Sequence, residues 1–249
     1  MSNPSASKIS RRGLLAASGG TLATLAGCAG LGSSSNSASP TTSDPSSTLP
    51  ASTIPLPATP SKHEYATMGH DSAPVSVTYL GNWKCPYCDQ FEEQGYWPTL
   101  ISKYVKAGKI QLTYRALAYG PNGKKPFLGP DAVRAARAGL DIWHTSPQKY
   151  WLYHAYLFAN QPSEKKRWAT TSHLLNDATQ IGLSKQTRTH LKSVLKGSTY
   201  EKALQQTVHY TDQLKIKGTP TLVINNSTTV NPLNTGKLKS ALSSALSKK

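Results

Sequence analysis

The decisive stretch of this sequence is VSVTYLGNWKCPYC, residues 75–88. Its first half is an apolar run whose β-branched and aromatic residues favour a strand. Its second half contains two cysteines, with Pro86 placed to open a helix. Free backbone N–H groups and the positive end of the helix dipole stabilise a thiolate at such a helix start. With two residues between them, the sulfurs of Cys85 and Cys88 lie one helical turn apart and within disulfide reach. The pattern therefore predicts thiol–disulfide exchange.

The first 28 residues predict export and attachment to a membrane. Two adjacent arginines at 11–12 precede a weak apolar stretch over residues 14–25, which is too short for a membrane span of roughly 20 residues and indicates a signal peptide over 1–27. The arginine segment resembles a twin-arginine export signal; an ordinary secretory signal is the alternative. The sequence Leu-Ala-Gly-Cys at 25–28 resembles a bacterial lipobox, in which the cysteine, here Cys28, is lipidated. A cysteine placed there by chance is the alternative to that anchor.

Residues 28–60 are expected to form a disordered linker. Ser, Thr, Pro, Ala and Gly dominate after Cys28, Asp44 is the only charged residue, and no apolar periodicity could build a core. Its prolines favour extended conformations, which would let a tethered domain reach substrates near the membrane. A passive spacer or a glycosylated stalk is equally consistent with this composition.

The cysteine count supports exchange over structural bridging. The chain has three cysteines, and if Cys28 carries lipid, one pair remains. A single pair so close in sequence cannot build a disulfide framework, and in an exported protein it favours exchange.

The remaining residues, 61–249, predict one folded α/β domain. We expect a strand at 75–81, a helix at about 86–106 and a strand at 110–117, followed by a helical block over about 130–215 without strands. Within this block Asp131 can cap a helix over 132–140, and Ser146-Pro147 can open an aromatic-rich helix. Strands return at 221–225 and 228–232, and a helix closes the chain at about 236–247.

Three motifs together resemble the DsbA-like family of extracytoplasmic thiol–disulfide oxidoreductases, especially its Gram-positive and lipoprotein forms. They are GHDSAPV at 69–75, GNWKCPYC at 81–88 and GTPT at 218–221. The resemblance covers about residues 64–247. It implies a thioredoxin-like core split by an inserted helical domain.

Chemistry and resemblance together suggest roles for the cysteine motif. Cys85 should be the attacking thiolate, stabilised by the adjacent Lys84, the helix dipole and Tyr87, and Cys88 should resolve the mixed disulfide. Pro86 presets the first helical turn. Tyr87 occupies the position at which the family tunes thiolate stability; a surface aromatic is the alternative.

By resemblance, Pro220 is a cis-proline that faces the disulfide. This would leave the backbone of Thr219 free to pair with an extended substrate segment. From the sequence alone, an ordinary trans proline at the start of a strand is equally consistent.

One position departs from the family. Six residues before the first cysteine, relatives often carry a buried acid that shuttles protons to the resolving cysteine, and this chain has Tyr79. Asp89 and Glu92 are close in sequence, but acids in a first helical turn are expected to be solvated, and neither is predicted to be catalytic.

Other readings explain less of the sequence. Glutaredoxins share the C-P-Y-C motif but lack an export signal and this helical block. Zinc would need two further ligands, and the seven histidines show no ligand spacing, so each is expected on the surface or on a helix face. A substrate-binding lipoprotein would leave the cysteine pair unexplained.

The charge of +16 falls to +13 when the three positive charges of the signal are removed, which favours anionic lipids or cell-wall polymers as contacts. Export argues against nucleic acid as a partner. We therefore predict a lipid-anchored, extracytoplasmic oxidase that acts on thiols of exported proteins and is reoxidised by a quinone-linked membrane partner. Reductase and isomerase remain open, although no dimerisation segment precedes the domain and a monomer is expected. No organic cofactor and no metal are expected.

Overall fold

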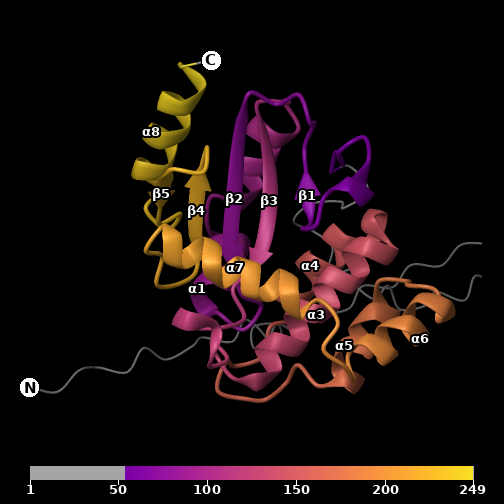
Figure 1. Ribbon diagram of the computed structural model, residues 1–249. Helices are drawn as coiled ribbons and strands as arrows, with labels where there is room; N and C mark the ends of the chain where they lie inside the picture. The colour runs from indigo at the N-terminus through magenta and orange to yellow at the C-terminus, as the bar shows by residue number, and fades with distance from the viewer. Residues whose placement is uncertain (1–53, 249) are drawn as a thin grey trace, which may run out of the picture. The chain divides into compact units, whose positions relative to one another are not determined.

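The computed structural model of the chain describes residues 54–248 (Figure 1). The expected signal peptide, Cys28 and most of the expected linker lie outside the described residues. The last residues assigned to the linker already pack on the domain. Ile54 and Leu56 contact the hydrophobic core, and the carbonyl of Pro55 accepts a hydrogen bond of 2.7 Å from the N–H of Gly69.

The core is a five-stranded mixed sheet with the order β1-β3-β2-β4-β5. The strands are β1 (Thr67–Met68), β2 (Val75–Gly81), β3 (Ile110–Ala116), β4 (Thr221–Ile224) and β5 (Thr228–Val230). Strands β2 and β3 run parallel, from Val75 opposite Ile110 to Gly81 opposite Ala116, and all other neighbours are antiparallel. The predicted strands are therefore confirmed to within two residues at their ends. Strand β1 was not predicted.

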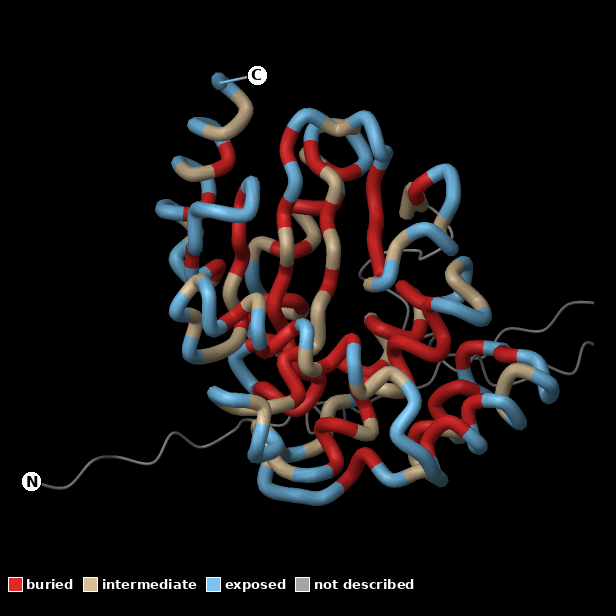
Figure 2. The backbone as a smooth tube through the Cα atoms, in the orientation of Figure 1, coloured by how far each residue is buried: buried red, intermediate tan, exposed pale blue. Residues whose placement is uncertain are grey.

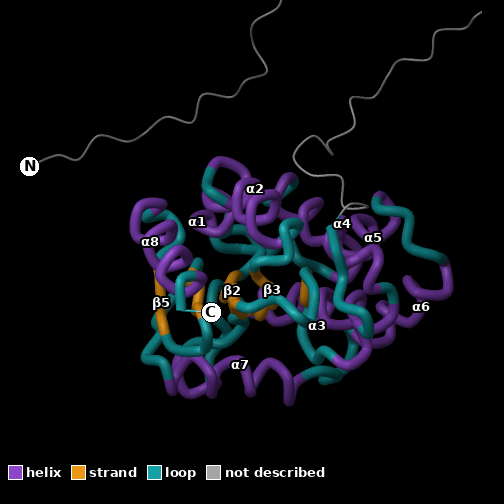
Figure 3. Tube along the Cα trace, turned by 90° about the horizontal axis from the view of Figure 1, so that it is seen from above, coloured by secondary structure: helices purple, strands orange, loops and turns teal. Residues whose placement is uncertain are grey.

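Helices cover both faces of the sheet (Figures 1 and 3). One face carries α1 (Pro86–Asp89), α2 (Trp97–Leu100) and α8 (Thr235–Leu246), and the other carries α7 (Glu201–Gln213). Four helices gather beside the sheet near the carboxyl end of β3: α3 (Pro130–Thr145), α4 (Pro147–Ala159), α5 (Thr171–Gln180) and α6 (Lys185–Val194). The predicted helical block between β3 and β4 and the closing helix are confirmed. Short 3₁₀ turns lie at Pro60–Lys62 and Pro121–Gly123.

The expected continuous helix over 86–106 is wrong. The segment divides into α1, a π-helical turn η3 (Gln90–Gln94), α2 and a second π-helical turn η4 (Ile101–Val105). The break falls at Gly95, where a Cβ would collide with the carbonyl oxygen of Phe91, and Pro98 lacks the N–H that would continue the helix. Buried residues line the inner faces of these turns and the strands behind them (Figure 2).

The expected cap of α3 is also wrong. The helix begins at Pro130 after Gly129, so that Asp131 lies inside the first turn, and its carboxylate is buried in an ion pair. Ser146 precedes α4 as predicted, with Pro147 at the first helical position.

Candidate active site

The two cysteines lie where β2 ends and α1 begins, at the carboxyl end of the parallel strand pair. Cys85 is the N-cap of α1 and Pro86 is its first residue, as the spacing predicts. The carbonyl of Cys85 accepts hydrogen bonds from the N–H of Cys88 at 3.1 Å and of Asp89 at 3.2 Å. This is the turn that brings two thiols of a C-x-x-C segment together.

Asn82 fixes the loop before the helix. Its carbonyl accepts a hydrogen bond of 2.9 Å from the N–H of Cys85, and its side-chain oxygen accepts one of 2.8 Å from the N–H of Lys84. Its amide nitrogen donates to the carbonyl of Leu117, just beyond β3. The buried Asn82 side chain therefore holds the thiol loop against the end of the sheet.

The two thiols differ in exposure. Both are free and both are buried, but Cys85 keeps 4 % of its area exposed whereas Cys88 has none. Tyr87 between them is 60 % exposed. An incoming sulfur can therefore reach Cys85 first, whereas Cys88 lies behind it.

The segment 218–221 leads into β4, the neighbour of β2 in the sheet, and contacts Cys85. The Thr219–Pro220 peptide bond is cis, as the resemblance implies. The thiol of Cys85 donates a hydrogen bond of 3.4 Å to the carbonyl of Thr219. Cys85, Cys88, Pro86, Tyr87, Thr219 and Pro220 are thus brought together, whereas Cys28 is outside the described residues.

The surroundings of the two sulfurs shift their pKa values in opposite directions. Hydrogen bonding with the thiol of Cys88, with Thr219 and with the N–H groups of Cys88 and Tyr87 lowers the pKa of Cys85 to about 6, against the opposing effect of burial. Burial first, and then the neighbouring Cys85, raise the pKa of Cys88. The geometry therefore provides one thiolate near neutral pH and one protonated thiol.

The expected contribution of Lys84 to thiolate stability is wrong. Its ammonium group turns inward and forms an ion pair of 2.7 Å with Asp131 of α3, with both side chains almost fully buried. The other carboxylate oxygen of Asp131 accepts a hydrogen bond of 3.2 Å from the N–H of Ala169. Lys84 therefore links the thiol loop to α3 through this ion pair. The thiolate of Cys85 is stabilised by hydrogen-bond donors instead.

Glu92 is also placed differently from the expectation. The carboxylate of Glu92 is buried, and its oxygens lie 2.9 and 3.0 Å from Nε2 of His154 in α4, which is buried too. The sequence predicted a solvated Glu92, whereas His154 lies on a helix face, one of its two expected positions, and that face is buried. A signal for Glu92 was available, because it lies four positions after Cys88 and thus on the same helix face.

Gln161 is a further residue that the sequence did not single out. It follows α4 and donates through Nε2 to the carbonyl of Trp83 at 2.8 Å and to that of Cys85 at 3.2 Å. The helical block therefore satisfies backbone acceptors of the thiol loop directly.

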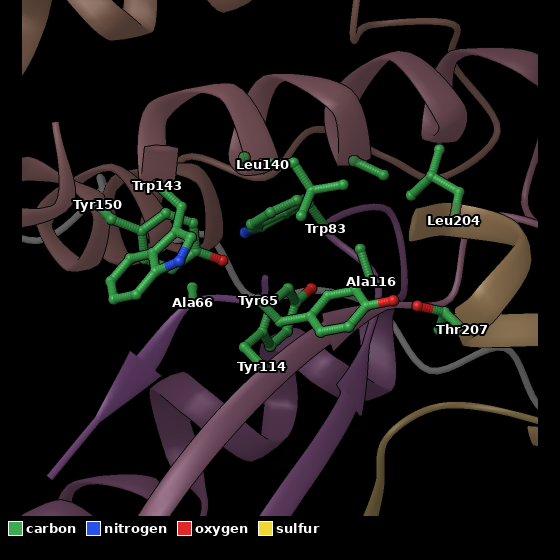
Figure 4. A pocket seen from close by; sticks show the side chains of 12 residues that line it. Tyr65, Ala66, Trp83, Tyr114, Ala116, Leu140, Trp143, Tyr150, Leu204 and Thr207 are labelled. Carbon is green, nitrogen blue, oxygen red and sulfur yellow. The ribbon is translucent and has the colours of Figure 1, made fainter. Parts of the chain in front are cut away.

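A small cavity lies between α3 and the sheet, with Trp83, Tyr114 and Trp143 among its walls (Figure 4). Its volume is about 10 Å³, enough for roughly one water molecule. It is too small for a peptide or cofactor, and neither cysteine lines it. Among residues 54–248, no three His, Cys, Asp or Glu side chains are arranged to bind a metal, and no helix combines the length and apolar character needed to cross a bilayer.

Comparison with known proteins agrees with this geometry. Residues 61–244 match the family model described as thioredoxin. Disulfide bond formation protein D of Bacillus subtilis is 25 % identical over 187 residues, which cover 75 % of this chain and 79 % of that protein. A probable disulfide bond formation protein D of Bacillus anthracis is 27 % identical over 182 residues, covering 73 % of this chain and 78 % of its own length.

Solved structures share the fold. The crystal structure of oxidised BdbD from Bacillus subtilis aligns with a TM-score of 0.65 at 23 % identity, over 78 % of this chain and 97 % of that one. DsbA of Chlamydia trachomatis aligns with a TM-score of 0.60 at 19 % identity, over 72 % of this chain and 90 % of that one. The predicted thioredoxin-like core with a helical insertion is confirmed. The chain belongs to the thioredoxin family, as a thiol–disulfide oxidoreductase of the DsbA-like kind.

Proposed function

We propose that this protein oxidises cysteine pairs of exported proteins through a disulfide between Cys85 and Cys88. The observation that carries the proposal is the contrast between Cys85, which is slightly exposed and has a pKa of about 6, and Cys88, which is fully buried and has a raised pKa. A substrate thiolate attacks Cys85, the bond to Cys88 breaks, and a mixed disulfide forms. A second substrate thiolate then attacks the substrate sulfur of that bond, which releases oxidised substrate and the Cys85 thiolate.

The direction of electron flow follows from thiolate stability. Whatever stabilises the thiolate of Cys85 stabilises the reduced pair, and a more stable reduced pair makes the disulfide a stronger oxidant. The hydrogen-bond donors around Cys85 support this direction. The two electrons gained from each substrate would pass to a membrane redox partner, in keeping with the names of the Bacillus relatives as disulfide bond formation proteins.

Substrate recognition would use the backbone beside the cis-proline. Thr219 is half-buried next to Cys85, where an extended peptide could add to the edge of the active-site loop. Pro220 would hold this segment opposite the sulfurs, and the exposed ring of Tyr87 would contact the substrate.

The proposed location is the outer side of the cell membrane. A signal peptide over 1–27, lipidation of Cys28, a linker that begins there and the folded domain that follows would tether the enzyme near exported chains. The basic charge would favour anionic lipid or cell-wall surfaces. Replacing Cys28 with Ala should move the protein from the membrane fraction to the medium; retention of the variant in the membrane would contradict the anchor.

The direction of electron flow is tested by measuring the reduction potential of the Cys85/Cys88 pair, equilibrated against glutathione. A value near roughly −120 mV is expected of a strong oxidant, whereas one near roughly −270 mV would identify a reductase. The roles of the cysteines are tested by Cys85→Ser, which should abolish exchange, and Cys88→Ser, which should accumulate mixed disulfides. Activity retained by Cys85→Ser would reverse the assignment.

A further inference from the structure

The buried sulfur of Cys88 needs a group that supplies a proton when the disulfide opens. When Cys88 leaves the disulfide it carries a negative charge, and this charge is costly in its fully buried position. Phe91 and Trp97 belong to the same buried core, and both rings pack against Tyr79. Bulk water is therefore a poor source of the proton, and a buried acid is needed.

Glu92 is placed to be that acid. It lies four positions after Cys88 along α1 and η3, so the two side chains share one helix face, and both are buried on it. Burial raises the pKa of Glu92, and the hydrogen bond and charge of His154 partly offset that effect. A carboxyl group shifted in this direction can hold a proton closer to neutral pH than an ordinary glutamate.

His154 holds the carboxylate in place. Its Nε2 lies within 3.0 Å of both oxygens of Glu92, and its ring is enclosed by aromatic side chains, the nearest being Tyr114 at 4.6 Å between ring centroids. Its Nδ1 is buried and makes no hydrogen bond to any group within residues 54–248. The pair is therefore isolated from solvent.

Tyr79 belongs to the same buried cluster as the sulfur of Cys88, and its ring lies 5.1 Å from that of Tyr114, which contacts His154. It is fully buried on β2, its ring packs edge-on against Phe91 at 5.4 Å, and its hydroxyl makes no hydrogen bond of ordinary geometry in the described part of the chain. Burial, followed by the charges of Cys88 and Glu92, raises the pKa of Tyr79, so both groups act on its hydroxyl. With both cysteines free, the hydroxyl of Tyr79 makes no hydrogen bond to the sulfur of Cys88 or to the carboxylate of Glu92.

We propose that the Glu92–His154 pair exchanges protons with Cys88 through the hydroxyl of Tyr79. This inference rests on the proposed function. As the bond between Cys85 and Cys88 breaks, its electron pair stays on Cys88. The sulfur takes the hydroxyl proton of Tyr79, and the tyrosine oxygen takes the proton that the pair shares. The pair is left with one negative charge, and the steps reverse when Cys88 attacks a mixed disulfide.

Seven titratable groups surround the carboxylate and would shape its pH response. They come from every element packed against it: Tyr79 of β2, Cys88 and Asp89 of α1, Glu93 of η3, Tyr114 of β3, and Tyr150 and His154 of α4. Glu93 is the matched control for Glu92, because it is the adjacent acid of the same turn and is only half-buried.

The test measures how fast Cys88 displaces glutathione from a preformed mixed disulfide on Cys85, between pH 5.5 and 8.5. Glu92→Gln and Tyr79→Phe should each slow release by about 100-fold at low pH, the lower end of general acid–base catalysis, and the deficit should shrink as pH rises. Glu93→Gln should stay within about twofold of the unmodified chain. His154→Gln, which still donates to Glu92 but holds no proton, should move the midpoint of the pH profile.

Alkylation of Cys85 provides the second readout, since its pH midpoint should be the same in all four variants. Equal release rates for Glu92→Gln, Tyr79→Phe and Glu93→Gln would overturn the relay. A slow Glu92→Gln beside a normal Tyr79→Phe would overturn the bridging role of Tyr79. Should Glu92→Gln fail to fold, Tyr79→Phe still decides the matter. Failure of the unmodified chain to release glutathione would instead contradict the proposed function.

Discussion

Replacing Cys88 with Ala should raise the pKa of Cys85, because the thiol of Cys88 is the largest single contributor to the low value of about 6. A hydrogen bond to a charged group contributes about 1.5–3 kcal/mol, which corresponds to about 1–2 pKa units. The pKa of the variant should then lie between about 7 and 8. At pH 6 the thiolate fraction would fall from about one half to between about 9 % and 1 %.

The assay is the rate of alkylation of Cys85 by iodoacetamide between pH 4 and 10, in the reduced protein. At pH 6 the rate of Cys88→Ala should be about 5 to 50 times lower than that of the unmodified chain, and the two rates should converge near pH 9. Cys88→Ser is the matched control, because its hydroxyl can still donate to the thiolate and its midpoint should move less. An unchanged midpoint in Cys88→Ala would refute the assigned cause, and a midpoint near 9 in the unmodified chain would refute the thiolate itself.

Three further predictions concern stability. Asp131→Asn should cost about 3–5 kcal/mol of unfolding free energy in urea, because Lys84 is left buried without its counter-ion; a loss below about 1 kcal/mol would contradict the burial of this pair. Gly139→Ala should cost about 1–3 kcal/mol, because a Cβ there would collide with the indole of Trp83, and an unchanged Tm would show that the ring can move aside. The low pKa of Cys85 lies below its ordinary value of 9.0, so its stabilising effect on the dithiol form is complete above pH 9 and is lost as pH falls through about 6. The Tm of the dithiol form relative to the disulfide form should therefore rise between pH 5 and pH 8, and a flat difference would count against the shift.

Local patterns were sufficient to predict most of the fold. Strands β2 and β3 were predictable because their side chains repeat along a few adjacent residues. Strand β1 could not be found in this way, since its two residues are too few to show a period and their pairing with β3 is set by the tertiary structure. The break at Gly95 did leave a local signal, because glycine followed by Pro98 disfavours a continuous helix.

In the candidate site, too, local spacing predicts some residues and distant contacts place the others. Cys85 and Cys88 follow from spacing alone, because a helical turn fixes how far apart their sulfurs can lie. The direction of the Lys84 side chain does not, since its partner Asp131 is 47 residues away in the chain. The same holds for Glu92, whose burial depends on His154, 62 residues further on. Pairs this distant are decided by how the helical block docks, which a single sequence does not encode in any short pattern.

That docking limits how this protein can be recombined with its relatives. Asp131, His154 and Gln161 all belong to the segment between β3 and β4, and each satisfies a buried or backbone group beside the thiols. A chimaera that received this segment from another oxidoreductase would leave the ammonium group of Lys84, the carboxylate of Glu92 and the carbonyl of Trp83 without these partners unless the donor supplied equivalents at the same places. The core and its helical insertion therefore cannot be exchanged independently. Substitutions in the core and in the insertion that alter these contacts are expected to be inherited together.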